Sequence, residues 1–237
     1  MTLQFYALDF IISPGEIEGA KQPRLEVTMN IRLAALIPLT FTFACGPKDA
    51  PVESAADSDA APVALTGAEL AGRWASGGCE AYDDGQGGKS YLTRDFTLTA
   101  DTWTLNLGLF GDEACSYALF TVEINGPYSL GGLSSVVPGA TEGDFSFGTI
   151  VWTAQDQSLA ETFTGAGCGA AVWEVGVPQD VTATGCIGVA HPIAECPTDH
   201  DVVALADGQL YFGERITNMC QVDGRPKALG PYGLDAR

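Results

Sequence analysis

The chain has 237 residues, enough for one substantial domain or two small ones, and its 46% hydrophobic composition excludes a wholly disordered protein. Thirty acidic residues against eleven basic ones give a formal net charge of -19. Nucleic acid and anionic membrane surfaces are therefore not expected partners, because both would repel the protein.

The N-terminal part of the chain has the pattern of an export signal. Residues 29–32 form a short basic head, and residues 33–44 form a mostly apolar run that is shorter than the roughly 20 residues of a bilayer span. The run ends at Cys45, which resembles the acylated cysteine of bacterial lipoproteins. We expect Cys45 to carry a membrane anchor, as in an outer-membrane lipoprotein that faces the periplasm or the surface; secretion without lipid is the alternative. Residues 1–28 are polar, and we expect translation to start after them, at Met29.

The rest of the chain divides into a tether and one domain. Residues 45–64 are rich in Ala, Pro, Asp and Ser and contain almost nothing to bury, which predicts a disordered tether. Over residues 65–237, Gly, Thr and aromatic residues dominate, and apolar residues recur with a period of two. This pattern predicts a single all-β domain, built as an antiparallel barrel or a strongly curved sheet.

The clearest predicted hairpin spans residues 92–109. A turn at residues 99–102 pairs Leu98 with Trp103 and makes one face of the hairpin apolar and the other rich in threonine. Arg94 lies in phase with the apolar face, where an unpaired charge is costly. We therefore expect Arg94 to point inward and to bind a partner.

The remaining strands are predicted from short apolar runs and turn signals. Asp207-Gly208 is a favoured two-residue hairpin turn, whereas Asn125-Gly126 precedes a proline and is as compatible with a bulge. The predicted strands cover residues 119–124, 144–154, 170–177 and 180–187, and the two sides of the hairpin at residues 202–212.

Seven cysteines make an odd number, and assigning Cys45 to the anchor leaves six for three disulfides in an oxidising compartment. The positions of the predicted turns and hairpins indicate which cysteines meet. The expected pairs are Cys79 with Cys115, Cys168 with Cys186, and Cys196 with Cys220.

Acidic and histidine side chains are the candidates for chemistry. Glu142 and Asp144 have two interpretations, as the partner of Arg94 or as the carboxylate pair of a hydrolase, and a ligand head group is a further partner for Arg94. His191 and His200 lie in a proline-containing loop, and no serine has a nucleophile-elbow motif. We expect no enzymatic activity and no cofactor.

A metal site is the alternative use of this loop. His191 and His200 flank Cys196, but a zinc site here would need reduced thiols, and the stretch lacks a Cys-x-x-Cys motif. We expect Cys196 to be oxidised and no metal to be bound.

Aromatic residues point to a ligand. Five of them are spread over different predicted strands, often beside small residues, which fits either an ordinary core or a curved sheet around an apolar cavity. With Arg94, they are the expected ligand-binding residues: Trp103, Phe145, Phe147, Trp152 and Trp173.

Several segments, in order and at consistent spacing, resemble the adenomatosis polyposis coli down-regulated protein family. They are "LAGRWASGGCE", "YLTRDFTL", "VPGATEGDFSF", "CGAAVWEVGVPQDVTATGC", "LYFG" and "RP", which together run across residues 65–232. The chain departs from the family at residues 82–88, which replace an Arg-Pro-Gly-Pro run.

The resemblance implies an extracytoplasmic, disulfide-linked, barrel-like domain with an apolar cavity that accepts acyl chains. Animal members bind an acylated Wnt ligand and carry two such domains before a transmembrane helix, whereas this chain has one. We therefore expect a lipid-anchored domain of the cell envelope that binds a lipid or acylated ligand. A purely structural envelope module and a carboxylate-dependent hydrolase are the alternatives.

Overall fold

The structure is a computed structural model that describes residues 62–83, 88–169, 171–186 and 190–237. Cys45, the expected signal peptide and most of the expected tether lie outside these residues. The helical elements are α1 (Gly67–Leu70), α2 (Gln157–Gly165) and the 3-10 helix η1 (Val222–Gly224). The strands are β1 (Gly72–Ser76), β2 (Glu80–Asp83), β3 (Lys89–Leu98), β4 (Thr102–Phe110), β5 (Ala118–Leu133), β6 (Thr141–Ser146), β7 (Thr149–Ala154), β8 (Gln179–Asp180), β9 (Thr198–Ala206), β10 (Gln209–Phe212) and β11 (Leu234–Ala236).

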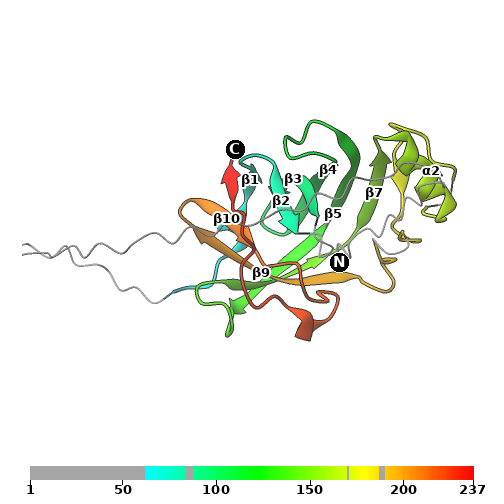
Figure 1. The fold of residues 1–237 in the computed structure, drawn as a ribbon. Helices are drawn as coiled ribbons and strands as arrows, with labels where there is room; N and C mark the ends of the chain where they lie inside the picture. The colour runs from blue at the N-terminus through cyan, green and yellow to red at the C-terminus, as the bar shows by residue number, and fades with distance from the viewer. Residues whose placement is uncertain (1–61, 84–87, 170, 187–189) are drawn as a thin grey trace, which may run out of the picture. The chain divides into compact units, whose positions relative to one another are not determined.

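Antiparallel strands close into a barrel, as the sequence predicts. Going around the barrel, β1 pairs with β3, followed by β4, β5, β6, β9, β10 and β11, and β11 pairs with β1. Strand β2 extends the sheet beside β3, and β7 and β8 extend it beside β5. In Figure 1, α2 lies beside β7 on the right of the view, and β10 lies on the left.

The registers of two predicted hairpins are confirmed. In the first, Leu98 pairs with Trp103, which turns the apolar side chains of β3 and β4 inward. In the second, Ala206 pairs with Gln209 across the Asp207-Gly208 turn, where both turn residues have positive φ. Such backbone angles are what the favoured two-residue turn requires.

Strand β5 differs from the prediction because it continues through Asn125-Gly126 without a turn. Before this point β5 pairs with β7, and after it with β6, so Pro127 lies where the partner changes and costs few ladder hydrogen bonds. A side chain at Gly126 would collide with the carbonyl of Ser146, so only glycine fits this close approach.

Between residue 144 and residue 187 the structure differs from the predicted strands in three places. The predicted strand 144–154 is divided into β6 and β7 by a corner at Phe147 and Gly148. Residues 157–165 form α2, whose N-cap is Asp156, and the predicted strand 170–177 is a loop in its described part. Of the predicted strand 180–187, only the start belongs to the two-residue strand β8.

The structure contains the three expected disulfides. They join Cys79 to Cys115, Cys168 to Cys186, and Cys196 to Cys220. Each connects segments separated by a turn or hairpin, and together they hold the loops that lie outside the barrel's hydrogen-bond ladder.

Within the part of the chain that the structure describes, the helices are too short or too polar to cross a membrane.

Candidate ligand cavity inside the barrel

The interior of the barrel is filled at one end and hollow at the other. The hollow part is a cavity of about 250 Å³. Its apolar lining consists of Leu92, Phe96, Trp103, Leu105, Leu107, Ile124, Phe145, Phe147, Phe212, Ile216 and Pro231. Ile216 lines the cavity and is nevertheless 73% exposed, so the cavity opens to solvent beside it.

Three of the five predicted aromatic residues line this cavity: Trp103, Phe145 and Phe147. Trp103 comes from β4, and its indole Nε1 donates a hydrogen bond of 3.0 Å to the backbone oxygen of Ser146, which fixes the ring. Phe145 and Phe147 come from β6 and the corner after it, and both rings contact the Trp103 ring at centroid distances of 5.6 and 5.8 Å.

Trp152 and Trp173, the other two expected ligand-binding aromatic residues, do not line the cavity. Trp152 lies on β7, outside the closed barrel, and is fully buried beneath α2. Its ring packs 5.5 Å from that of Phe163, which in turn packs 5.0 Å from Trp173. These residues form a second aromatic cluster because β7 leaves the barrel wall and α2 covers its inner face.

Arg94 points inward as predicted and lines the cavity, but its partner is Glu80. Nε of Arg94 lies 2.9 Å from the Glu80 carboxylate, and Nη2 donates to both Glu80 and the backbone oxygen of Tyr232. The Glu80 side chain is only 4% exposed. Ser76 and Tyr82 donate their hydroxyl protons to the same carboxylate.

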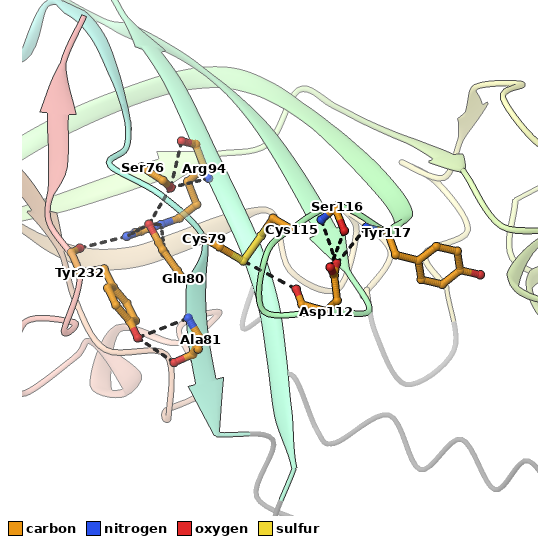
Figure 2. Close-up of a disulfide and its surroundings, with 10 residues drawn as sticks. All are labelled: Ser76, Cys79, Glu80, Ala81, Arg94, Asp112, Cys115, Ser116, Tyr117 and Tyr232. Atoms are coloured by element: carbon orange, nitrogen blue, oxygen red, sulfur yellow. Dashed lines mark hydrogen bonds and ion pairs between the residues drawn. A yellow bond between two sulfur atoms is a disulfide. The ribbon is translucent and has the colours of Figure 1, made fainter.

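A disulfide fixes the position of this ion pair. Figure 2 shows Arg94 and Glu80 beside the bond between Cys79 and Cys115, with Tyr232 on the other side. Cys79 directly precedes Glu80, so the disulfide holds the start of β2 against the loop between β4 and β5. In that loop, Asp112 accepts hydrogen bonds from the backbone of Ser116 and Tyr117.

A second charged group at the cavity was not predicted from the sequence. Arg215, on the loop after β10, lies 2.9 Å from Asp199 and 2.9 Å from Asp201, both on β9. All three line the cavity. Burial raises the pKa of Asp201, although the charge of Arg215 opposes this effect. The sequence signal that could have revealed this group is the alternation in β9. Asp199 and Asp201 lie four and two residues before the inward Val203 and therefore point to the same face.

Glu142 and Asp144 lie on the other face of β6 and are not among the residues that line the cavity. Asp144 is held by Arg225 and His200, each with an atom 2.8 Å from its carboxylate. Partial burial raises the pKa of Asp144, but the hydrogen bonds from His200 and Arg225 outweigh it and leave the pKa below its usual value. The prediction that these acids pair with Arg94 is therefore wrong.

The loop before β9 holds a disulfide and two histidines with acidic neighbours. Cys196 is bonded to Cys220, so its sulfur is not a thiolate that could bind zinc. Nδ1 of His200 lies 2.8 Å from the Asp144 carboxylate, and the side chain of His191 is half exposed near Glu195.

Most of the side chains that line the cavity are apolar, and the charged ones among them include Arg94, Asp199, Asp201 and Arg215. Pockets of this kind bind by removing apolar ligand surface from water and use a few polar groups for orientation.

The sequence model of the family described as adenomatosis polyposis coli down-regulated 1 matches residues 51–173, just over half of the chain. The match includes β1 to β7 and α2 and ends before the strands β9 to β11 that complete the barrel. The family is not a known enzyme family. Together, the match and the three disulfides indicate an extracytoplasmic binding domain.

Proposed function

Because the chain belongs to the adenomatosis polyposis coli down-regulated 1 family, we propose that its barrel binds the acyl chain of a lipid or of an acylated ligand. The observation that carries this proposal is the cavity, whose lining is mostly aromatic and aliphatic and includes a few charged side chains. The acyl chain lies along the apolar wall, and the polar end of the ligand remains beside the charged side chains.

The size of the cavity is compatible with this ligand. One water molecule occupies about 30 Å³ in the liquid, so 250 Å³ corresponds to about eight such volumes. A methylene group is of comparable size, and each one removed from water contributes about 0.8 kcal/mol. Part of a longer acyl chain would fit as well, with the remainder extending past Ile216.

Arg94 is the proposed contact for the polar end of the ligand. Its Nε and Nη2 atoms are occupied by Glu80 and Tyr232, and no described residue accepts a hydrogen bond from Nη1. Glu80 already balances the charge of Arg94 and holds the guanidinium in place. Nη1 can therefore donate to a carbonyl or hydroxyl oxygen of the ligand with little loss of side-chain entropy.

Tryptophan fluorescence tests the proposal, with monooctanoylglycerol below its critical micelle concentration as the ligand. We expect a saturable change that persists in Trp152→Phe and is largely lost in Trp103→Phe, because Trp103 lines the cavity and Trp152 does not. No saturable change in the native protein would contradict acyl-chain binding and would favour a structural envelope module. A signal that depends on Trp152 would place the ligand elsewhere.

The proposal also includes attachment to a membrane through Cys45. Its support is the sequence alone, in which Cys45 ends the apolar run and is the cysteine left over from three disulfides. Two or more acyl chains are enough to hold a protein stably on a membrane. Cys45→Ser should release the protein into the soluble fraction after export, and a substituted protein that stays with the membrane would overturn this part.

A further inference from the structure

We infer that four aromatic rings form a floor across the barrel that limits how far an acyl chain can enter. This inference rests on the proposed function and specifies it, because it makes the preferred buried segment a chain of about eight carbons. The four residues, named here the aromatic floor, are Phe96, Trp103, Phe145 and Phe212.

The rings of the aromatic floor contact one another in a closed cycle. Phe96 stacks on Phe212 at a centroid distance of 4.5 Å, and Phe212 lies 5.6 Å from Phe145. Phe145 lies 5.6 Å from Trp103, and Trp103 lies 6.3 Å from Phe96. Since the rings come from β3, β4, β6 and β10, which are distributed around the barrel, the cycle spans its interior.

The lining of the cavity ends at the aromatic floor. On β3, Phe96 lines the cavity but Leu98, the next inward residue, does not. On β10, Phe212 lines it but Leu210 does not. The cavity therefore lies on one side of the floor only.

The other side of the floor is solid core. Leu98 is 3% exposed and Leu210 is fully buried, so apolar contacts replace empty space there. Leu70 of α1 is also fully buried and accepts a hydrogen bond from the Trp74 indole through its backbone oxygen. A chain that reaches the floor cannot extend further without displacing packed side chains, which is costly in a dense interior.

A floor of this kind gives a distinct dependence of affinity on chain length. Each added methylene should raise the affinity about fourfold while the chain still fills the cavity. Once the chain reaches the floor, further carbons must remain outside the apolar wall, and the affinity should stop rising. The break is expected at about eight to ten carbons.

Isothermal titration calorimetry of the purified protein tests the floor, with monoacylglycerols of six to fourteen carbons in steps of two as the ligands. In the native protein, we expect about a fifteenfold gain in affinity for each step before the break and almost none after it. Phe96→Ala removes one ring of the floor and should move the break to a chain longer by about two carbons.

The matched control is Phe163→Ala, which removes the same group from the second aromatic cluster, away from the cavity. It should lower the stability of the protein to a similar degree and leave the break unchanged. If Phe96→Ala does not fold, the milder substitutions Phe96→Leu and Phe212→Leu test the same floor. They should also move the break to a longer acyl chain.

The outcomes separate the two proposals. An affinity that keeps rising beyond twelve carbons, or a break that stays in place in the Phe96 and Phe212 variants, would overturn the aromatic floor and leave acyl-chain binding standing. No binding by any chain length in the folded native protein would overturn acyl-chain binding itself.

Discussion

At the scale of single residues, the most informative feature is the ion pair between Arg94, which lines the cavity, and Glu80. Burying such a pair is favourable only where further hydrogen bonds satisfy both groups. Ser76, Tyr82 and the backbone of Tyr232 supply them. The ion pair is thus a fixed part of the wall, in which Nε and Nη2 of Arg94 are held by Glu80 and Tyr232.

Removing Arg94 should destabilise the protein, because the Glu80 carboxylate would remain buried without its counter-charge. We expect Arg94→Leu to lower the free energy of unfolding by about 3 to 5 kcal/mol in denaturant titrations. Arg73 provides the control, since its pair with Asp95 lies on the outer face and its side chain is 60% exposed. Arg73→Leu should cost less than about 1 kcal/mol. Equal costs for the two variants would mean that the inner pair is well solvated.

The sequence predicts that Arg94 points inward but does not predict its partner. The inward direction follows from the period of β3 and the turn before β4, both of which are local. The partner is on β2, a four-residue edge strand whose side chains show no clear alternation of apolar and polar types. Glu142 and Asp144 on β6 face away from the barrel interior. Neighbouring side chains of a strand point to opposite faces, and Phe145 takes the inward position.

The long connection from β10 to β11 is the decisive feature at the scale of elements. It lines the cavity with Arg215 and Ile216, and Cys220 anchors it to the segment before β9. On the outer face, Arg225 donates to the backbone oxygens of Gly143 and Asp201 and to the carboxylate of Asp144. Strand β10 pairs only with the second half of β9. The connection takes the place of a pairing strand beside the first half.

The contact between Asp144 and Arg225 should make this connection sensitive to acid. Asp144 has a lowered pKa in the folded protein, so its charge stabilises the fold above the ordinary value of about 3.9, and this stabilisation is lost as the pH falls through the lower folded pKa. Asp144→Asn should therefore lower the free energy of unfolding by about 1 kcal/mol at pH 7, the range of a partly exposed pair. The difference from the native protein should vanish near pH 2.

Asp223→Asn is the control for this measurement, because Asp223 is an exposed residue of the same connection. It should change the free energy of unfolding at pH 7 by less than about 0.5 kcal/mol, as exposed substitutions usually do. A difference between native protein and Asp144→Asn that is constant from pH 7 to pH 2 would contradict the ionic contribution of Asp144.

Helix α2 is the element that the sequence did not reveal. Asp156 caps it by accepting hydrogen bonds from the backbone of Ser158 and Leu159, but the helix has only nine residues. Its buried residues, Leu159, Ala160 and Phe163, are too few to establish a helical period against the strand-like pattern around them. Tertiary packing on Trp152 and Trp173 decides its conformation.

At the scale of the whole molecule, a closed barrel needs no second layer over its inner face, so its interior can hold a ligand. Part of that interior is filled by packed side chains such as Leu98 and Leu210, and part of it is the cavity. The sequence predicts the barrel because the alternation in the strands is local and strong. It does not predict which aromatic residues share the interior, since that depends on where β7 leaves the wall.

Photo-crosslinking tests most directly whether an acyl chain occupies the barrel. The probe is a monoacylglycerol of about ten carbons with a diazirine at the end of its chain, and the labelled peptides are identified by mass spectrometry. We expect labels on β3, β4 and β10, at or beside Phe96, Trp103 and Phe212, and their loss when unlabelled ligand is added in excess. Labels confined to α2, the Trp173 loop or the outer face of the sheet would contradict the account.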